Sequence, residues 1–294
     1  MRIFIAGATG FVGAHLRRQL LAQGHQLRLL VHGRSGNLAT GEEAVTGDVR
    51  DPSSFNEAAA GCDAVINLVG IIREYPAKGV TFQALHVDTT ANVLAAAKSA
   101  GVRRYLQMSA NGTRPNAVAA YHRTKWAAEE LVRNSGLDWT IFRPSLIFGP
   151  QDAFVNMLAG FIRSYPAVPV IGDGSYPMQP ISADDVARCF AKALDLPATI
   201  GQTYCLCGPE RMSYAELLDT IGRALGKNWV LKVPQPLGLM KLVVPFMQTF
   251  DAFPLTMDQL TMLTEGNICE GNIPEEFGFA PEGFSAGIRR YLAP

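Results

Sequence analysis

Two residues that could act together on a carbonyl group stand four positions apart near the middle of the chain. Tyr121 and Lys125 fall in Y-H-R-T-K, on a segment with helical character, so both side chains project from one face. A nearby lysine favours the phenolate, and we expect it to lower the pKa of the Tyr121 phenol until this group can exchange protons near neutral pH. Because Y-x-x-x-K also occurs on ordinary helices, its meaning depends on the other motifs.

A glycine-rich segment near the N-terminus is the second motif. The stretch G-A-T-G-F-V-G follows the apolar run R-I-F-I-A and leads into F-V-G-A-H-L-R-R-Q-L-L-A-Q-G, a strand–turn–helix order. Gly7 permits a tight turn, Gly10 lets backbone amides approach a pyrophosphate, and Gly13 lets the helix lie close to the sheet. The segment therefore predicts a dinucleotide site, with a purely structural turn as the alternative. The predicted contacts are Gly7, Thr9, Gly10, Phe11, Val12 and Gly13.

The end of the second apolar run, L-L-V-H-G-R, bears on which dinucleotide binds. NAD sites usually place Asp or Glu there to bind the ribose 2′-hydroxyl, whereas this chain has His32 and then Arg34. Arg34 can form paired hydrogen bonds to a 2′-phosphate, with Ser35 as a second donor. The sequence therefore favours NADP(H) and leaves NAD(H) as the alternative, unless Arg34 is simply a solvated loop charge.

Further candidate contacts follow the next two apolar runs. Ligands of open α/β sheets bind beyond the carboxyl ends of the strands. Residues 48–49 follow the third run and are expected to flank the adenine, while residues 67–70 end the fourth run beside the expected path of the nicotinamide. These candidates are Asp48, Val49, Asn67, Leu68, Val69 and Gly70.

The elements that must position these residues alternate in type through the first half of the chain. Six short apolar runs, from R-I-F-I-A-G to D-W-T-I-F-R-P, are mostly separated by amphipathic segments of helical length. This alternation predicts an α/β fold with a Rossmann-type, doubly wound parallel sheet over residues 1–150. Residues 151–294 are expected to form a smaller, mostly helical substrate or partner lobe, while about 183–208 returns to the main sheet.

The most apolar helix-like segment of the second half is P-L-G-L-M-K-L-V-V-P-F-M-Q-T-F. Lys241 and Pro245 interrupt it, and it is shorter than the ~20 residues needed to cross a bilayer, so we expect no transmembrane segment. We expect a helix packed on the core of the lobe. Contact with a membrane surface is the alternative, because exposed apolar faces mark partner or membrane sites.

Composition excludes some function classes. The chain has 294 residues, 48% of them hydrophobic, and 26 basic residues balance 26 acidic ones, so no basic field points to nucleic acid. The cysteines are odd in number and scattered, and no His, Cys or carboxylate cluster has metal-ligand spacing. We expect no metal, reduced thiols and a cytoplasmic location, since the N-terminus also lacks the pattern of a signal peptide. The cysteines are Cys62, Cys189, Cys205, Cys207 and Cys269.

Two smaller groups have structural interpretations. His122 faces a different side of its helix from Tyr121, and we expect it at the surface or at an interface. Asp184 and Asp185 are expected to cap the helix that begins beside them rather than to form a catalytic carboxylate pair.

Together these motifs resemble an extended short-chain dehydrogenase/reductase over most of the chain. The resemblance rests on A-G-A-T-G-F-V-G, G-D-V, Y-H-R-T-K, F-R-P-S-L-I-F-G-P and Q-P-I-S-A-D-D-V-A. Finer features, N-L-V-G-I-I-R-E, T-F-Q-A-L-H-V-D-T-T-A-N-V and S-A-N-G, resemble one atypical branch, bacterial proteins similar to the nucleotide-binding accessory subunit of respiratory complex I. That branch implies a Rossmann fold and a retained NAD(P) site, often with no established turnover.

The resemblance also assigns residue roles and reveals one departure. Family enzymes usually place Ser or Thr just after the fifth strand, where it binds the substrate oxygen beside the catalytic Tyr. Here Ser109 falls slightly early, as a cofactor contact, and Asn111 stands at the catalytic position. Asn111 can donate a hydrogen bond, yet reduced or absent turnover is implied. By resemblance, Lys125 also holds the nicotinamide ribose, and Pro144 and Ser145 contact the carboxamide region.

Two functions stay open at this point. In the first, the nucleotide is structural or sensory, and the protein acts through a partner such as a membrane-associated respiratory complex, peripheral to the inner face of the membrane. In the second, the protein is an NADP-dependent oxidoreductase, or a nucleotide-sugar epimerase or dehydratase, that uses Tyr121 and Lys125 on a small-molecule substrate. Asn111 favours the first. Residues 150–182 offer few cations besides Arg163 for a sugar diphosphate, which weakens the epimerase.

Overall fold

The computed structural model describes residues 1–33, 37–250, 253–271 and 273–293, and the chain divides into two compact units. The first unit contains Met1–Pro144, Ala183–Cys205 and Pro274–Phe277. The second contains Ser145–Ser182, Leu206–Ile273 and Gly278–Pro294. Each unit has a hydrophobic core of its own.

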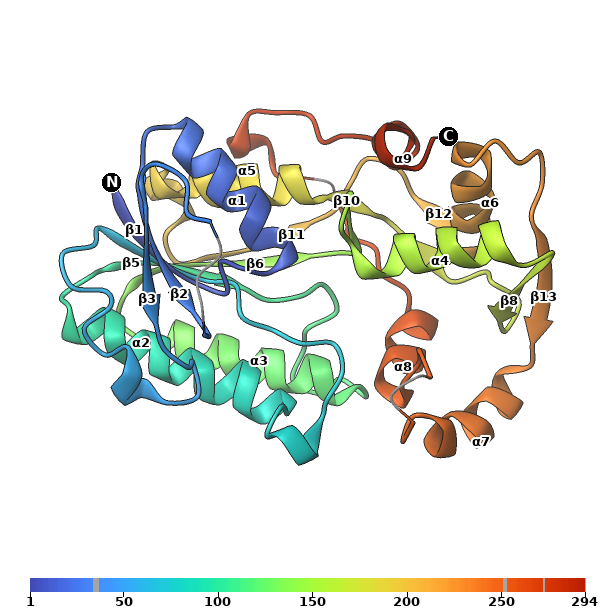
Figure 1. The fold of residues 1–294 in the computed structure, drawn as a ribbon, viewed down its shortest axis with the longest axis horizontal. Coiled ribbons are helices and arrows are strands. Elements are labelled where there is room, and N and C mark those ends of the chain that lie inside the picture. The colour runs from blue at the N-terminus through green and yellow to red at the C-terminus, as the bar shows by residue number, and fades with distance from the viewer. Residues whose placement is uncertain (34–36, 251–252, 272, 294) are drawn as a thin grey trace. The chain divides into compact units, whose positions relative to one another are not determined.

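The first unit is built on a seven-stranded sheet with the order β11-β6-β5-β4-β1-β2-β3 (Figure 1). The central strands are apolar because both of their faces are covered, and Ile3, Phe4 and Ile5 of β1 have no exposed surface. Strands β1 to β6 pair in parallel, which confirms the predicted Rossmann-type sheet. The strands are β1 (Arg2–Ala6), β2 (Gln26–Val31), β3 (Glu42–Thr46), β4 (Ala64–Asn67), β5 (Arg104–Met108), β6 (Asp138–Pro144) and β11 (Gln202–Leu206).

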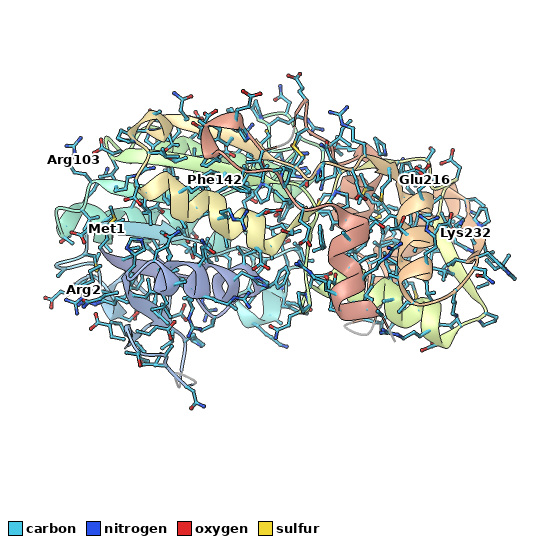
Figure 2. All side chains as sticks on the ribbon, turned by 90° about the horizontal axis from the view of Figure 1, so that it is seen from above. Met1, Arg2, Arg103, Phe142, Glu216 and Lys232 are labelled. Atoms are coloured by element: carbon cyan, nitrogen blue, oxygen red, sulfur yellow. A yellow bond between two sulfur atoms is a disulfide. The ribbon has the colours of Figure 1, made fainter. Side chains whose placement is uncertain are left out.

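Helices cover both faces of this sheet (Figure 1). On one face α1 (Phe11–Ala22) packs against α5 (Ala183–Leu194), and on the other α2 (Thr89–Ser99) packs against α3 (Ala120–Arg133). The π-helix η3 (Gln83–Asp88) precedes α2, and short 3₁₀ turns are η1 (Pro52–Ser54), η2 (Pro76–Lys78), η4 (Pro197–Thr199) and η5 (Glu275–Phe277). Figure 2 shows Phe142 of β6 among the packed side chains, where its ring lies 4.4 Å from that of Phe190 in α5.

The winding of the chain creates a switch point between β1 and β4. From β1 the chain moves outward through β2 to β3, and it then crosses back to β4 and continues through β5 to β6. Connections after β1 and β4 therefore leave in opposite directions and open a crevice at the carboxyl edge, where ligands of such sheets bind.

The second unit combines helices with short strand pairs. Strand β7 (Ile147–Phe148) pairs with β10 (Ile181–Ser182), β9 (Pro177–Met178) with β12 (Met212–Ser213), and β8 (Ala167–Ile171) with β13 (Leu231–Gln235). Its core includes Leu158, Leu217 and Phe284. Its helices are α4 (Ala153–Ser164), α6 (Tyr214–Ala224), α7 (Leu237–Met247), α8 (Met257–Glu265) and α9 (Phe284–Leu292).

Helix α7 does not pack on the core, contrary to the expectation for this apolar segment. Val244 is its one buried residue, and the helix lies against α8. Leu242 is 67% exposed and Phe246 is 72% exposed. Within the part of the chain that the structure describes, no helix has the length and apolarity that a membrane span requires.

Asp184 and Asp185 occupy the first turn of α5 rather than a capping position before it. The Asp184 carboxylate lies 2.6 Å from Nδ1 of His15 and accepts a hydrogen bond from Arg18 at 3.2 Å. The Asp184 side chain thus ties α5 to α1, while both carboxylates stand in the first turn, where the helix dipole favours negative charge.

The expectation that all cysteines are reduced thiols is wrong for Cys207 and Cys269. They form a disulfide, with their Cα atoms 6.0 Å apart, although 62 positions separate them in the sequence. The Gln179 side chain links their segments, because its oxygen accepts from the N–H of Cys269 at 3.0 Å and its nitrogen donates to the carbonyl of Gly208 at 2.8 Å. A cytoplasmic location therefore loses the support that reduced thiols lent it. The remaining thiols are Cys62, Cys189 and Cys205.

The disulfide gives a direct prediction. Cys269→Ala should lower the free energy of unfolding by about 2–4 kcal/mol, because the cross-link restricts the unfolded chain. Denaturant titrations should show that a reductant destabilises the wild type by the same amount and leaves the variant unchanged. Five titratable thiols in unfolded, unreduced wild type, instead of three, would rule out the bond.

Candidate functional site

The glycine loop joins β1 to α1 at the carboxyl edge of the sheet. Gly7 has a φ of +82°, which L side chains rarely adopt, and a Cβ there would lie 3.0 Å from the backbone of residues 68–69. The N–H of Gly10 donates to the carbonyl of Gly7 at 3.1 Å and closes the turn. A Cβ on Gly13 would lie 2.5 Å from the carbonyl oxygen of Ala8, so α1 approaches the loop as closely as its backbone permits.

The first turn of α1 provides backbone donors for an anion. Gly10 is the N-cap residue and has no side chain that could accept from the first N–H groups. These N–H groups and the helix dipole favour a negative charge in front of the helix. A Cβ on Gly10 would meet only the Gly7 carbonyl oxygen, at 3.3 Å, so the space in front of this residue is otherwise open. This cradle fits a pyrophosphate.

Asp48 and Val49 lie just beyond β3, where the adenine was expected. Arg50 forms a 2.6 Å ion pair with Asp48 and holds the pKa of that carboxyl below its usual value. The carbonyl of Val49 accepts a hydrogen bond from Asn92 of α2 at 2.9 Å. The predicted 2′-phosphate residues Arg34 and Ser35 lie outside the described residues, so the choice between cofactors stays a prediction.

Asn67 fixes the turn that follows β4. This fully buried side chain accepts from the N–H of Val69 at 3.1 Å and donates to Thr90 at 3.3 Å and to Gln107 at 3.2 Å. The first bond closes the turn and the other two tie it to α2 and β5, so residues 67–70 are held in place beside the glycine loop.

Lys125 of α3 reaches across to the same turn. Its Nζ donates to the carbonyls of Val69 and Met108, each at 3.3 Å, and a Cβ on Gly70 would lie 2.7 Å from that nitrogen. Burial lowers the pKa of Lys125 to about 8, although the charge of Glu129 acts in the opposite direction. The lysine thus joins the carboxyl ends of β4 and β5, where the nicotinamide ribose is expected.

Tyr121 lies in an aromatic cluster. Its ring makes edge contacts with Phe82, His86 and His122 at centroid distances of 5.8, 5.3 and 5.3 Å. Burial raises the pKa of Tyr121 to about 12, so the expectation that Lys125 lowers it is wrong. Four-residue spacing puts the two side chains on one face, yet the cause that acts on the pKa of Tyr121 is the loss of hydration of the phenolate.

His86 and His122 both contact the Tyr121 ring, and the sequence patterns indicate no role for His86. His122 is buried, so the expectation of a surface position is wrong. His86 lies 2.9 Å from the hydroxyl of Thr124, and burial together with the charge of Lys125 lowers the pKa of His86 to about 2. The sequence signal was the segment T-F-Q-A-L-H-V-D, which forms the π-helix η3, a distortion frequent at functional sites.

Ser109 and Asn111 are both engaged by the protein itself. The Ser109 hydroxyl donates to Glu129, which is fully buried and accepts from Nε of Arg143 at 2.8 Å. The backbone N–H of Asn111 donates to the carbonyl of Pro144 at 2.8 Å. The Ser109 hydroxyl therefore adds a hydrogen bond to the buried ion pair between Glu129 and Arg143.

Ser145, which was predicted with Pro144 to contact the carboxamide, belongs to the second unit. Ser145 begins the second unit, and its hydroxyl donates to the carbonyl of Gln179 at 2.6 Å. The first unit alone brings together the loop, the turn at 67–70, Tyr121 and Lys125.

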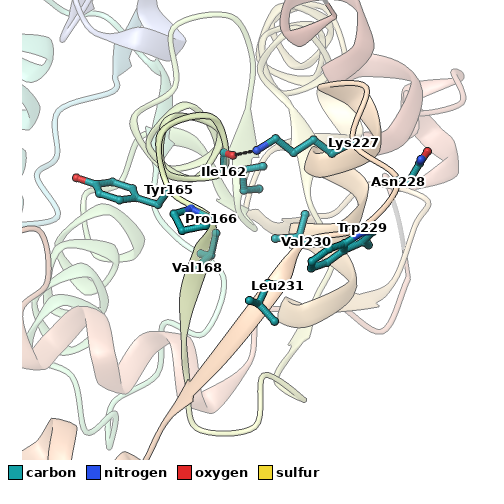
Figure 3. A pocket seen from close by; sticks show the side chains of 9 residues that line it. All are labelled: Ile162, Tyr165, Pro166, Val168, Lys227, Asn228, Trp229, Val230 and Leu231. Atoms are coloured by element: carbon teal, nitrogen blue, oxygen red, sulfur yellow. Dashed lines mark hydrogen bonds between the residues drawn. The ribbon is translucent and has the colours of Figure 1, made fainter.

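A cleft of about 310 Å³ in the second unit contains none of these residues (Figure 3). Its walls come from residues 162–168 and 227–231, including the aromatic side chains of Tyr165 and Trp229. The ammonium group of Lys227 forms a hydrogen bond within the wall of the cleft, because it donates to the carbonyl of Ile162. The cleft has no set of converging polar groups comparable to the glycine loop.

Comparison with known proteins places this geometry in context. A family model described as NAD(P)H-binding matches residues 7–197. The mitochondrial subunit 9 of the NADH dehydrogenase (ubiquinone) 1 alpha subcomplex from Arabidopsis thaliana is 31% identical over 289 residues, which cover 91% of this chain and 71% of that protein. A ceramide reductase from Caulobacter vibrioides is 32% identical over 178 residues, which cover 59% of this chain and 55% of that protein.

Solved structures share the fold. The crystal structure of a dTDP-glucose 4,6-dehydratase from Streptomyces venezuelae, with NAD bound, superposes with a TM-score of 0.77. The superposition covers 99% of this chain and 96% of that one, at 21% sequence identity. At this identity the likeness concerns the fold alone.

The burial of Lys125 predicts a pH dependence. Its pKa is lower in the folded protein than the ordinary value of 10.5, so between about pH 8 and 10.5 the unfolded chain binds more protons. The free energy of unfolding should then rise with pH, by up to about 1.4 kcal/mol per pH unit from this group. Lys125→Met should remove that contribution. Denaturant titrations of both proteins at pH 7, 8, 9 and 10 test it, and parallel pH profiles would contradict it.

Proposed function

We propose, on the premise that the chain belongs to the NAD(P)H-binding family, that it holds a dinucleotide as a structural or sensory group and acts with a protein partner. It is an atypical short-chain dehydrogenase/reductase with similarity to complex I accessory subunits. The observation that carries the proposal is the glycine loop at the switch point of the sheet, with the uncapped N-terminus of α1 directly behind it.

Different residues of the first unit would bind different parts of the dinucleotide. The N–H groups at the start of α1 would bind the pyrophosphate, residues 48–49 would flank the adenine, and Lys125 would hold the nicotinamide ribose. Asn67 would act indirectly, because its three hydrogen bonds position the turn that borders the nicotinamide. The bound dinucleotide supplies hydride-transfer capacity, which the protein uses only if a proton donor stands beside the substrate.

The weak point of this site for chemistry is the second donor to the substrate oxygen. Tyr121, whose pKa burial raises to about 12, stays protonated and can still donate, but Asn111 stands at the position of the substrate-binding hydroxyl, and the Ser109 hydroxyl donates to Glu129. Losing one donor to a developing oxyanion typically costs ~10² to 10³ in rate. These contacts support binding with little turnover.

The second candidate is an active NADP-dependent oxidoreductase, epimerase or dehydratase that uses Tyr121 and Lys125. The observation in its favour is that Lys125 donates to the turn at residues 67–70, while Tyr121 packs on His86, which is hydrogen-bonded to Ile71 directly after that turn. The fold likeness to a sugar-nucleotide dehydratase agrees with it, but Asn111 stands where the substrate-binding hydroxyl would be.

We further propose a partner of the respiratory-complex class and a cytoplasmic location, peripheral to the inner face of the membrane through that partner. The support is the similarity to a mitochondrial protein whose name places it in NADH dehydrogenase.

Nucleotide binding is tested by Gly10→Val, which should abolish binding of either dinucleotide because the side chain occupies the pyrophosphate space. The backbone φ of Gly10 is −75°, so valine should leave the fold intact. Gly160→Val is a matched control, since nothing lies within 4 Å of a Cβ there. Fluorescence titration measures dinucleotide binding, and circular dichroism checks that each variant is folded. Normal binding by Gly10→Val would show that the loop is only a structural turn.

Binding is separated from chemistry by Tyr121→Phe. This variant should keep nucleotide affinity and complement a deletion strain, whereas Gly10→Val should not complement. If Tyr121→Phe is folded and loaded with nucleotide but fails to complement, the active-enzyme alternative replaces the accessory role.

We also propose that NADP(H) binds more tightly than NAD(H), because Arg34 replaces the acidic residue that would repel a 2′-phosphate. Arg34→Ala should cost about 1–3 kcal/mol of that preference, the value of a charge-assisted hydrogen bond. The exposed Arg103 gives a matched control, Arg103→Ala, and titrations with both cofactors measure the difference. Equal affinities in the wild type, or a preference that survives Arg34→Ala, would refute the assignment.

A further inference from the structure

The imidazole of His86 links the turn after β4 to helix α3. Its Nε2 lies 3.2 Å from the backbone nitrogen of Ile71, which directly follows that turn. Its Nδ1 lies 2.9 Å from the hydroxyl of Thr124, the residue before Lys125. The same lysine donates to the carbonyl of Val69 in the turn. These contacts form a closed ring, which runs from the turn through the imidazole and α3 back to the turn.

The neighbours of this imidazole determine which nitrogen carries its proton. Burial, together with the charge of Lys125, lowers the pKa of His86 to about 2, so the ring is neutral and has one donor and one acceptor. The Thr124 hydroxyl has a single proton, which it donates to the carbonyl of Ala120 at 2.9 Å. Nδ1 of His86 is therefore the donor to Thr124, and Nε2 accepts from the N–H of Ile71.

Aromatic contacts hold the imidazole in this orientation. Phe82 stacks on it at a centroid distance of 5.2 Å, and Tyr121 meets it edge-on at 5.3 Å. The carbonyl of His86 accepts from the Thr90 hydroxyl at 2.6 Å, which fixes the backbone of the π-helix η3 at this point. The residue is buried, so water does not compete for its two hydrogen bonds. The imidazole is therefore a bridge of fixed length between the turn and α3.

This bridge bears directly on Lys125. A Cβ on Gly70 would lie 2.7 Å from Nζ of the lysine, so the turn and the ammonium group are in close contact. If the turn moved away from α3, the carbonyl of Val69 would no longer accept from Nζ, and water would reach the ammonium group. The length of the bridge thus sets the position of the lysine charge.

We propose that His86 is a positioning residue, which holds the turn after β4 against α3 and thereby places the Lys125 ammonium group for the nicotinamide ribose. It acts through Lys125 and exchanges no proton. The inference rests on the proposed dinucleotide function, because the ribose is the ligand that Lys125 would hold.

Two substitutions separate the two hydrogen bonds of the imidazole. His86→Gln keeps an acceptor and a donor on a side chain of similar reach, whereas His86→Asn reaches Thr124 but stops short of Ile71. Titrations with NADPH and NADH should show nearly wild-type affinity for His86→Gln and a loss of about tenfold for His86→Asn, the size of one hydrogen bond to a charged group. His25→Asn is the matched control and should bind normally, because His25 lies beside Met1 at the amino edge of the sheet.

A double variant shows whether His86 acts through the lysine. In a Lys125→Met background, His86→Asn should weaken binding no further, because the group that it positions is gone. NMR of protein labelled at the lysine Cε follows the titration of Lys125 itself, whose signal is the one missing from Lys125→Met. Its pKa should stay at about 8 in His86→Gln and rise toward 10.5 in His86→Asn, because water would reach the ammonium group. A loss of stability alone would not move this signal.

Thr124→Val cuts the same ring at its other end. It should also raise the pKa of Lys125 and weaken dinucleotide binding, and it replaces His86→Asn if circular dichroism shows that variant to be unfolded.

The outcomes distinguish this proposal from the proposed function. If the wild type binds neither dinucleotide, the nucleotide function fails, and the Lys125 titration still decides the role of His86. Three results would overturn that role. These are normal dinucleotide affinity in folded His86→Asn, a further loss when it is added to Lys125→Met, and a Lys125 titration that neither His86→Asn nor Thr124→Val changes.

Discussion

The candidate site depends on how closely α1 lies against the loop and sheet edge. Gly13 leaves no room for a Cβ beside the carbonyl of Ala8, and Gly7 leaves little beside the turn after β4. These contacts bring the helix N-terminus, with its unpaired N–H groups, to the switch point where the turns after β1 and β4 diverge. A side chain at Gly13 would push the helix outward, and the N–H groups would no longer converge with residues 67–70 on one ligand.

Buried charge determines what this arrangement does chemically. Lys125 is dehydrated and partly compensated by two carbonyls, while Glu129 is compensated by Arg143, Arg133 and the hydroxyl of Ser109. The same burial that lowers the pKa of the lysine raises that of Tyr121. The polar groups at the carboxyl ends of β4 and β5 are thus held by buried contacts, and the Tyr121 phenol stays protonated at neutral pH.

Local sequence patterns predicted the parallel sheet, because strand–helix alternation and the glycine turn are local features. They could not predict what depends on distant neighbours. The Cys207–Cys269 bond joins positions 62 apart, the pKa of Tyr121 depends on burial beside His86 of η3, and the buried imidazole of His122 lies against residue 112. The apolar composition of α7 indicated burial, but only the fold shows that the core of the second unit closes without it.

Native mass spectrometry, after incubation with an equimolar mixture of NADP(H) and NAD(H), tests the central claim most directly, because it detects the bound ligand without presuming any reaction. The account predicts one dinucleotide per chain with the mass of the form that carries a 2′-phosphate, and its loss in Gly10→Val. A folded wild type that carries neither dinucleotide would contradict the account.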